Sequence, residues 1–140
     1  MIGVREALAR LEEAVASGEL AELCRDFDVE ILTLFGSAAT GPMDIEPRDI
    51  DLAVGFAPGA QRDFLGVVNA LGELVPGDHV DVMDLDRAGP VAQRAAMLGS
   101  RVLYETHLSV TTEREIRAYM AYEDTRRLRA LQTEMLRTGR

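Results

Sequence analysis

The feature that most constrains this chain is a turn and a carboxylate pair, each attached to an apolar segment. The first apolar segment runs directly into Gly36-Ser37, and the second begins at Ile50, just after Asp49. Successive residues of a strand point to opposite faces, so Asp49 and Asp51 share one face while Ile50 points into the core. The chain therefore presents two carboxylates side by side on the second strand.

This arrangement has a specific chemical use. Two carboxylates a few Å apart repel each other and raise each other's pKa unless a positive group lies between them. A hard divalent cation with oxygen ligands, typically Mg²⁺, is the usual solution. A Gly-Ser turn beside such a site leaves backbone N–H groups for a phosphate. Together these features indicate phosphoryl or nucleotidyl transfer from a nucleoside triphosphate.

The order and spacing of Gly36-Ser37 and Asp49-Ile50-Asp51 resemble the signature of the DNA polymerase β-like nucleotidyltransferases. The small size of the chain is similar to that of the minimal nucleotidyltransferases (MNT), the antitoxins of HEPN–MNT toxin–antitoxin modules. That family carries a third carboxylate on a later strand. The matching residue here is Asp81, which lies between two valines. The resemblance covers roughly the first hundred residues and rests on three separate pieces in the right order.

The resemblance implies a role for each of these residues. Asp49 and Asp51 would bridge two Mg²⁺ ions, and Asp81 would bind the ion that activates the nucleophile. Gly36 and Ser37 would hold the β- and γ-phosphates of ATP. The implied reaction is transfer of AMP to a tyrosine of a cognate HEPN toxin, a helical ribonuclease that the modification silences. The implied partner is that toxin, in a hetero-oligomer with this chain.

The sequence departs from the family pattern beside the motif. Arginines often follow the Gly-Ser turn in the family, whereas alanines follow Gly36-Ser37 here. A small residue often precedes the Asp pair, and here that residue is Arg48. Because triphosphate binding depends on cationic groups, we expect Arg48 to contact the nucleotide in place of the missing arginines.

Two other functions are compatible with these residues. The chain is also suited to neutralise its partner by binding alone, with a vestigial site. An intact set of Asp49, Asp51 and Asp81 argues against this, because close carboxylates are costly to keep together. A small-molecule nucleotidyltransferase of the aminoglycoside type is the other alternative, and it requires a deep acceptor pocket. Related enzymes of that kind generally add further domains.

The length and composition are those of one globular domain. We expect a single nucleotidyltransferase domain over residues 1–140, with a core at about 1–106 and a C-terminal helix at about 109–137. No apolar run approaches the eighteen or so residues that span a bilayer, and the N-terminus turns charged too early for a signal peptide. The only cysteine, Cys24, excludes an internal disulfide. These features predict a cytoplasmic protein.

The net charge of −9 argues against general nucleic-acid binding. The charge is unevenly distributed, because residues 113–140 hold seven arginines and five acids, whereas the remainder holds eight arginines and nineteen acids. A long terminal helix there has more surface than a small body can cover. It either packs across the sheet with a solvated outer face or docks a partner through its tyrosines and arginines.

The pattern of apolar residues predicts an α/β (α+β mixed) fold, with helices packed on a small mixed sheet. We expect strands at 29–35, 50–56, 78–86 and 101–105, and helices at 4–16, 20–26, from Ser37, at 61–74, 90–98 and 109–137. The resemblance implies the same architecture, a polymerase β-like nucleotidyltransferase core.

Several finer expectations concern single residues. We expect the Ser37 hydroxyl to cap the short helix that it begins. Asp81 is expected on a central strand, with Asp84 as the alternative ligand if the register of that strand is shifted. Asp86 is expected to cap the next helix, and His79 to be a surface residue. The strand at 101–105 is expected at an edge of the sheet.

Overall fold

The computed structural model describes residues 2–42 and 44–139. Its elements, in chain order, are α1 (Val4–Ser17), α2 (Glu19–Asp26), β1 (Val29–Phe35), α3 (Ser37–Thr40), β2 (Ile50–Phe56), α4 (Phe64–Leu74), β3 (Val80–Asp84), α5 (Pro90–Met97), β4 (Arg101–Glu105) and α6 (Val110–Thr138). The expected mixed α/β fold is confirmed, and β1 and β2 have the predicted bounds. Among the described residues, no helix is both long and apolar enough to cross a bilayer.

The four strands form one mixed sheet in the order β3-β2-β1-β4. β1 pairs antiparallel with both β2 and β4, and β2 pairs parallel with β3. β4 is an edge strand, as predicted. β3 is the other edge, so the expectation that Asp81 lies on a central strand is wrong. The error arose because flanking valines are also found on an edge strand that has one covered face.

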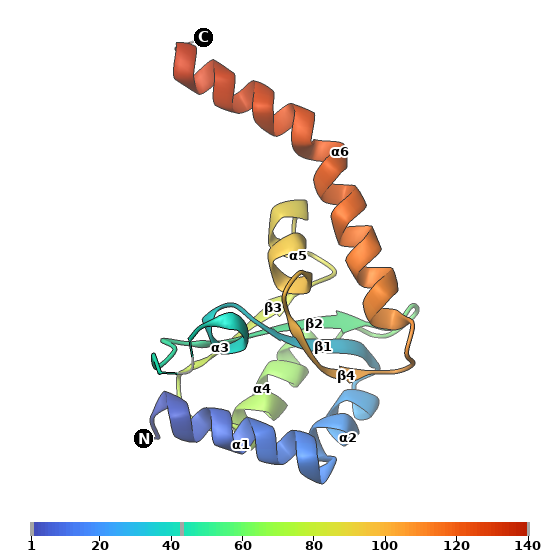
Figure 1. Ribbon diagram of the computed structural model, residues 1–140. Helices are drawn as coiled ribbons and strands as arrows, with labels where there is room; N and C mark the ends of the chain where they lie inside the picture. Colours follow the sequence, from blue (N-terminus) through green and yellow to red (C-terminus); the bar gives the residue numbers. More distant parts are fainter. Residues whose placement is uncertain (1, 43, 140) are drawn as a thin grey trace.

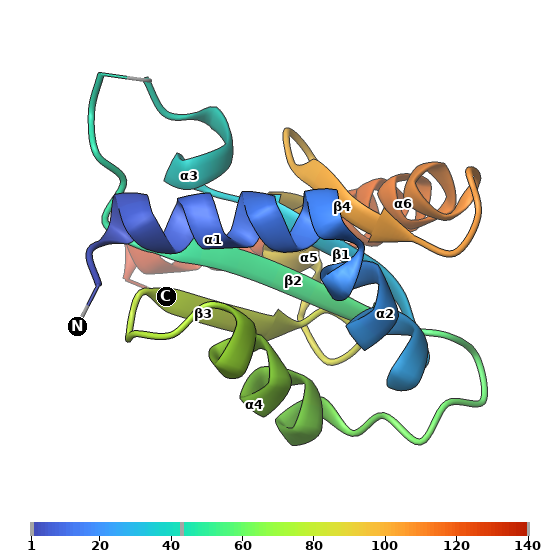
Figure 2. The same cartoon turned by 90° about the horizontal axis from the view of Figure 1, so that it is seen from below.

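One face of the sheet is covered by α1, α2 and α4 (Figures 1 and 2). The apolar stripe of α1, which includes Leu11, packs with Leu20 of α2 and Leu71 of α4 in the main core. β2 contributes every second residue to this core, namely Ile50, Leu52, Val54 and Phe56. Because side chains alternate along a strand, Asp51 and Ala53 must face the opposite side of the sheet.

The opposite face is only partly covered, by α5 and the first part of α6 (Figure 1). Ala53 and Ile31 pack there with Met97 of α5 and Ala118 of α6. The hydroxyl of Thr33 donates to the carbonyl of Ala96 over 3.4 Å, which fixes α5 to β1. α3 lies to one side of these helices in Figure 1. The start of β2 therefore lies on a face that α5 and α6 leave accessible.

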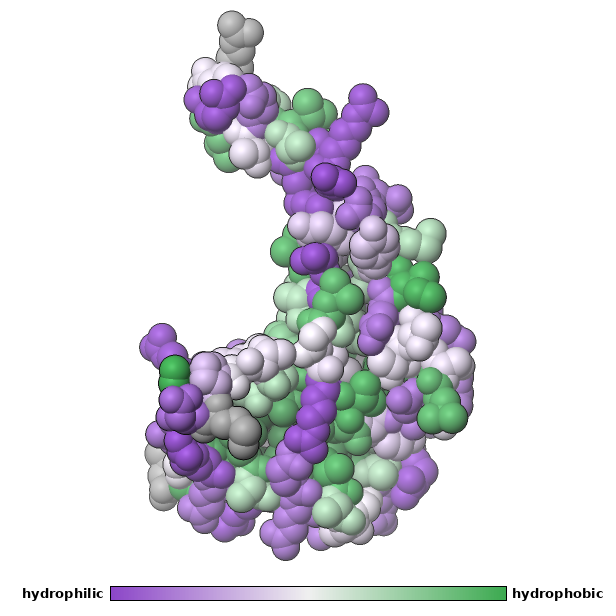
Figure 3. All heavy atoms as spheres, in the orientation of Figure 1, coloured by the Kyte–Doolittle hydropathy of each residue, from purple (hydrophilic) through white to green (hydrophobic). Residues whose placement is uncertain are grey.

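The C-terminal part of α6 extends well beyond the body of the protein (Figure 1). In Figure 3 the molecular outline is hollowed between this projecting part and the body. The ring centroid of Tyr122 lies 4.5 Å from the guanidinium of Arg94 and 3.8 Å from that of Arg129. The contact of Arg94 with Tyr122 connects α5 to α6.

Two predicted boundaries are wrong for local reasons. The fourth helix begins at Phe64 rather than at residue 61, because Arg62 adopts a left-handed conformation with φ 55° and Asp63 caps the helix through Gly66 N–H. The third strand covers Val80–Asp84 only, because the backbone turns after Asp84, whose carboxylate accepts from Asp86 N–H.

Candidate active site

Two of the three predicted carboxylates are direct neighbours across the sheet. Asp51 of β2 and Asp81 of β3 are register partners in the parallel pair, and on its other side Asp51 pairs with Phe35 of β1. Asp49 precedes β2 by one residue. The sheet thus places all three carboxylates at the start of two adjacent strands, on the side where α3 follows β1.

The electrostatics of Asp51 reflect this crowding. Burial raises the pKa of the half-buried Asp51 carboxyl above its ordinary value, and the charges of Asp81 and Asp49 raise it further. Asp49 and Asp81 are exposed. Among the described residues, no arginine or histidine forms an ion pair with any of the three. The site is an uncompensated cluster of negative charge.

Gly36 is fitted closely against this cluster. Its backbone has φ 73° and ψ −154°, a conformation that is essentially restricted to glycine. A Cβ atom at this position would lie 2.6 Å from Oδ2 of Asp51. The turn after β1 therefore passes directly over the Asp51 carboxylate, and only glycine permits that approach.

The turn leaves two backbone donors available. The carbonyl of Gly36 accepts from the N–H groups of Ala39 and Thr40 at 3.1 and 3.2 Å, and the hydroxyl of Thr40 also donates to it. In the described part of the chain, the N–H groups of Ser37 and Ala38 form no such bond. Gly36, not Ser37, is the N-cap residue, so the predicted cap is wrong and the Ser37 hydroxyl is exposed and unused.

The connector between the turn and β2 lies beside a small cavity. A cavity of about 250 Å³ is lined by Ser37 and Ala38 of α3, by Arg5 of α1 and by Ile45 and other connector residues. Arg48 is exposed at the end of this connector. Nothing in the described structure brings Arg48 into an ion pair. Its assignment to the nucleotide stays a prediction.

The carboxylates suit magnesium by donor type rather than as a closed cage. Within residues 2–42 and 44–139, no three His, Cys, Asp or Glu side chains are placed to hold an ion by themselves. Mg²⁺ is commonly held by one or two protein carboxylates together with substrate phosphates and water. The pair of Asp51 and Asp81, with Asp49 adjacent, fits that mode of binding by donor type.

The remaining candidates of this region have structural roles. His79 is half-buried, and its ring Nε2 lies 3.2 Å from the carbonyl oxygen of Ile2, so it joins the N-terminus to β3. Asp84 closes the turn after β3 and lies 3.8 Å from the guanidinium of Arg87. The expectation that Asp86 caps α5 is wrong, because Gly89 is the N-cap residue of that helix.

Asp86 instead belongs to a buried ion cluster that the sequence did not predict. Arg114 is 7% exposed and donates to Asp86 over 2.8 Å and to Glu30 over 2.8 and 3.1 Å. Burial acts to lower the pKa of Arg114, but the hydrogen bonds to Asp86 and Glu30 raise it overall. Its remaining contact is the carbonyl of Phe56 at 3.1 Å. The only sequence signal was the place of Arg114 four residues before Ala118, on the inner face of α6.

Comparison with known proteins places this geometry in context. A family model described as "Polymerase beta, Nucleotidyltransferase" matches residues 19–108. This span includes β1, the Gly36-Ser37 turn and all three carboxylates. No curated protein matches the chain.

Several solved structures share the fold. A chain of a toxin–antitoxin complex with AMP-PNP superposes with a TM-score of 0.65 at 20% identity, over 85% of this chain and 97% of the other. The toxin–antitoxin MntA–HepT gives 0.61 at 20% identity, over 85% and 95%. A complex of a tri-AMPylated Shewanella oneidensis HEPN toxin with an MNT antitoxin gives 0.62 at 19% identity, over 85% and 94%. At these identities the likeness establishes the fold.

Proposed function

This chain belongs to the polymerase beta nucleotidyltransferase family, and from that membership we propose that it transfers AMP from ATP to a tyrosine hydroxyl of a HEPN-type ribonuclease toxin. It acts as the antitoxin of that pair. The proposal is supported by the solved toxin–antitoxin complexes of the same fold, one of which holds AMP-PNP and another a tri-AMPylated HEPN toxin.

The observation that carries the proposal is the contact of the Gly36 turn with Asp51. A Cβ built on Gly36 would lie 2.6 Å from Oδ2 of Asp51, so the turn lies close against that carboxylate. This proximity supports a triphosphate held by the turn beside the carboxylates. Asp51 in turn faces Asp81 across the strand pair. A nucleotidyltransferase requires this proximity because the transferred phosphorus must lie between the groups that activate the nucleophile and those that hold the leaving group.

Each residue of the site has a separate role in the proposed reaction. The unused N–H groups of Ser37 and Ala38, with the Ser37 hydroxyl, hold the β- and γ-phosphates as donors. Asp49, Asp51 and Asp81 would hold Mg²⁺, which would neutralise phosphate charge. Asp81, exposed on the edge strand, accepts the proton of the tyrosine hydroxyl. The tyrosine oxygen forms a bond to the α-phosphorus, the bond from that phosphorus to the bridging oxygen breaks, and pyrophosphate leaves.

A protein acceptor suits the open form of this site. Asp49 and Asp81 are exposed, as are the Gly36-Ser37 turn and Arg48. Small-molecule acceptors are normally held in concave pockets that bury most of their surface. An accessible edge strand instead admits a side chain presented by another protein. We also propose a cytoplasmic location, because a chain with the single cysteine Cys24 fits a reducing compartment.

The projecting part of α6 offers a surface for such a partner. Leu128, Leu131 and Met135 are 59%, 56% and 55% exposed. Their spacing of three and four residues places them on one side of the helix, and we call them the distal apolar stripe. Large exposed apolar side chains that gather on one surface are typical of interaction sites. Figure 3 shows hydrophobic spheres among hydrophilic ones along this part of the helix.

The proposal is tested by incubating the purified protein with ATP labelled at the α-phosphate, Mg²⁺ and the purified HEPN partner. Transfer of label to the partner, and its loss when the acceptor tyrosine is replaced by phenylalanine, is the expected result. In a parallel incubation that also contains an aminoglycoside, label on the aminoglycoside and none on the partner would instead indicate a small-molecule nucleotidyltransferase. A complex that forms without any label transfer would leave an antitoxin that acts by binding alone.

A further inference from the structure

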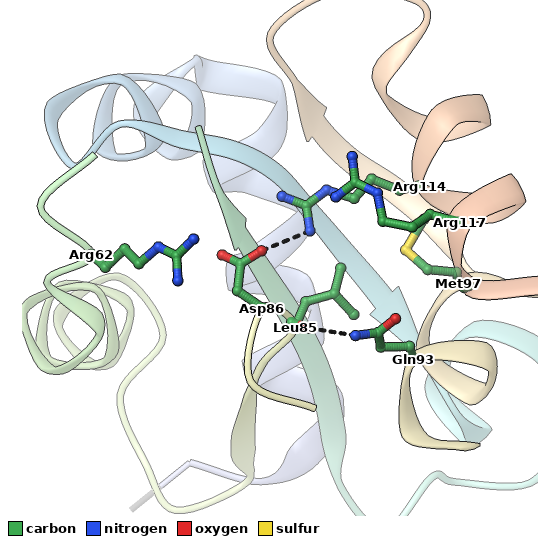
Figure 4. Close-up of a pocket in the computed structure, with 8 residues that line it drawn as sticks. Arg62, Leu85, Asp86, Gln93, Met97, Arg114 and Arg117 are labelled. Carbon is green, nitrogen blue, oxygen red and sulfur yellow. Dashed lines mark hydrogen bonds and ion pairs between the residues drawn. The ribbon is translucent and has the colours of Figure 1, made fainter. Parts of the chain in front are cut away.

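A second polar cavity lies at the far end of the sheet from the carboxylates. It has a volume of about 240 Å³ and lies between the β2–α4 connection, the turn after β3, α5 and α6. Its lining residues are Arg62, Leu85, Asp86, Gln93, Met97, Arg114, Arg117 and Ala118 (Figure 4). Asp51 and Phe56 lie at opposite ends of β2, about 16 Å apart at 3.3 Å per residue. The cavity is therefore separate from the candidate active site.

Three guanidinium groups meet at this cavity. Figure 4 shows Arg62 on one side of Asp86, and Arg114 and Arg117 on the other. Arg114 is paired with Asp86 and Glu30, but Arg62 and Arg117 have no ion-pair partner within the described residues. Three cations against two carboxylates give a local excess of positive charge in a protein whose net charge is −9. The one carboxylate between them, Asp86, is already paired with Arg114, so Arg62 and Arg117 keep their charge for a ligand.

The floor of the cavity is pre-organised to donate a hydrogen bond. Arg114 is 7% exposed, and its contacts to Glu30, Asp86 and the Phe56 carbonyl account for four of the five N–H groups that a guanidinium carries. The fifth, on Nη1, has no acceptor in the described structure. Because an unpaired donor on a buried charge is costly, a ligand oxygen would stabilise this group.

The opposite wall provides an acceptor and an apolar surface. The side-chain amide nitrogen of Gln93 donates to the carbonyls of Leu85 and Ala88 at 3.3 and 2.9 Å, so the orientation of the amide is fixed. The Gln93 side-chain carbonyl is then left as an acceptor. Met97, beside it, is buried and apolar. This wall is suited to the less polar part of a ligand whose charged group faces the arginines.

We propose that this cavity binds a small phosphate-bearing anion through Arg62, Arg117 and the remaining N–H of Arg114. Guanidinium groups bind phosphate by paired hydrogen bonds. Arg62 approaches the cavity from the β2–α4 connection, and Arg114 and Arg117 approach it from α6, so one ligand can be held from two sides. Arg62 is held at φ 55°, a conformation unusual for a residue other than glycine, which is consistent with a side chain positioned for a ligand. The site does not use the proposed catalytic residues.

The test is a calorimetric titration of the full-length protein with inorganic phosphate, in buffer that contains chelator and no divalent cation. Arg62→Gln/Arg117→Gln is expected to weaken binding by about tenfold or more, because charge-assisted hydrogen bonds are removed. Arg127→Gln, an exposed arginine further along α6, is the matched control and is expected to bind as wild type does. Asp51→Asn is also expected to retain binding, which separates this site from the proposed active site.

Parallel titrations with pyrophosphate and AMP identify the source of the phosphate group. Binding of AMP that is tighter than that of phosphate in wild type, a preference that Arg62→Gln/Arg117→Gln loses, would assign a nucleotide whose base lies on the Met97 side. Equal affinities would assign a free anion. The proposal is overturned if wild type does not bind any of the three, or if the double variant and Arg127→Gln lose the same affinity. Each variant of an exposed arginine must melt at the same temperature as wild type, which verifies that the variant is folded.

Discussion

Asp51 and Asp81 face each other as register partners on neighbouring parallel strands, and among the described residues neither carboxylate has a cationic partner. Parallel pairing normally joins residues that pack in a core. A pair of like charges at such a position opposes folding and is retained only where it serves a purpose. The proposed function gives the pair such a purpose, in nucleotidyl transfer.

Replacing Asp51 with asparagine is expected to stabilise the cation-free protein at neutral pH. Burial and the charges of Asp81 and Asp49 raise the pKa of Asp51 in the folded state. A carboxyl with a raised folded-state pKa contributes stability below its unfolded pKa, and this contribution is lost as pH rises through the folded value. Differential scanning fluorimetry with chelator should give a melting temperature roughly 2–4 °C higher for Asp51→Asn at pH 7.

The same variant has a pH signature. Its advantage over wild type should disappear on acidification, because Asp51 is then protonated in both states. Added Mg²⁺ with ATP should stabilise wild type and leave Asp51→Asn unchanged. Asp44→Asn, in the exposed connector, is the matched control. An Asp51→Asn protein that melts below wild type at neutral pH would contradict the charge cluster described above.

Gly36→Ala is expected to impair both the turn and the site. The added methyl group would lie 2.6 Å from Oδ2 of Asp51, on a backbone with φ 73°. Strain of this kind costs on the order of 1–3 kcal/mol, and the Asp51 side chain must move to relieve the clash. Urea denaturation should report the lost stability. Gly59→Ala, at φ 81° with no atom near the position of its Cβ, is the control for backbone strain alone and should keep ATP binding.

Arg114 is expected to dominate the stability of the sheet's far end. Arg114→Met would leave Glu30 and Asp86 without their cation in a largely buried place. Breaking a buried ion pair in this way costs about 3–5 kcal/mol. Urea denaturation of Arg114→Met and of the triple variant Glu30→Gln/Asp86→Asn/Arg114→Met measures this. The triple variant should recover most of the loss, and a triple variant as unstable as the single one would assign the effect to packing instead.

The distal apolar stripe is expected to contribute to partner affinity and not to folding. Leu131→Glu places a charge in the middle of the stripe, on a residue that is 56% exposed. Loss of a central apolar anchor typically weakens binding by about tenfold or more. Thr133→Glu adds the same charge at an exposed position on another side of α6. Surface plasmon resonance against the HEPN partner should give a weaker affinity for Leu131→Glu than for Thr133→Glu. Equal affinities of the two variants would exclude the stripe from the interface.

The core elements were predictable because their local signals agree with their tertiary roles. The apolar run at 29–35 and the strand that begins at Ile50 are buried and have the predicted bounds. The spacing of Gly36-Ser37 and the Asp pair predicted a shared site, and the structure brings Gly36 and Asp51 together. Their proximity follows from the antiparallel pairing of β1 and β2, which a short connector favours.

The features that sequence reasoning missed depend on long-range contacts. The position of β3 at a sheet edge is set by its pairing with β2, and no local pattern around Asp81 encodes it. The ion cluster joins Glu30, Asp86 and Arg114, which are separated by 28 and 84 residues along the chain. The left-handed conformation of Arg62 also has no sequence signal, because glycine is the residue that normally indicates one.

The most direct test of the central claim is the intact mass of the HEPN partner after co-expression with wild type, with Asp49→Ala/Asp51→Ala or with the control Asp44→Ala. We expect the partner to be heavier by whole AMP units with wild type and Asp44→Ala, and unmodified with the double variant. A partner of unchanged mass in all three cells would contradict nucleotidyl transfer to it. A partner modified equally with the double variant would contradict the assignment of the reaction to these carboxylates.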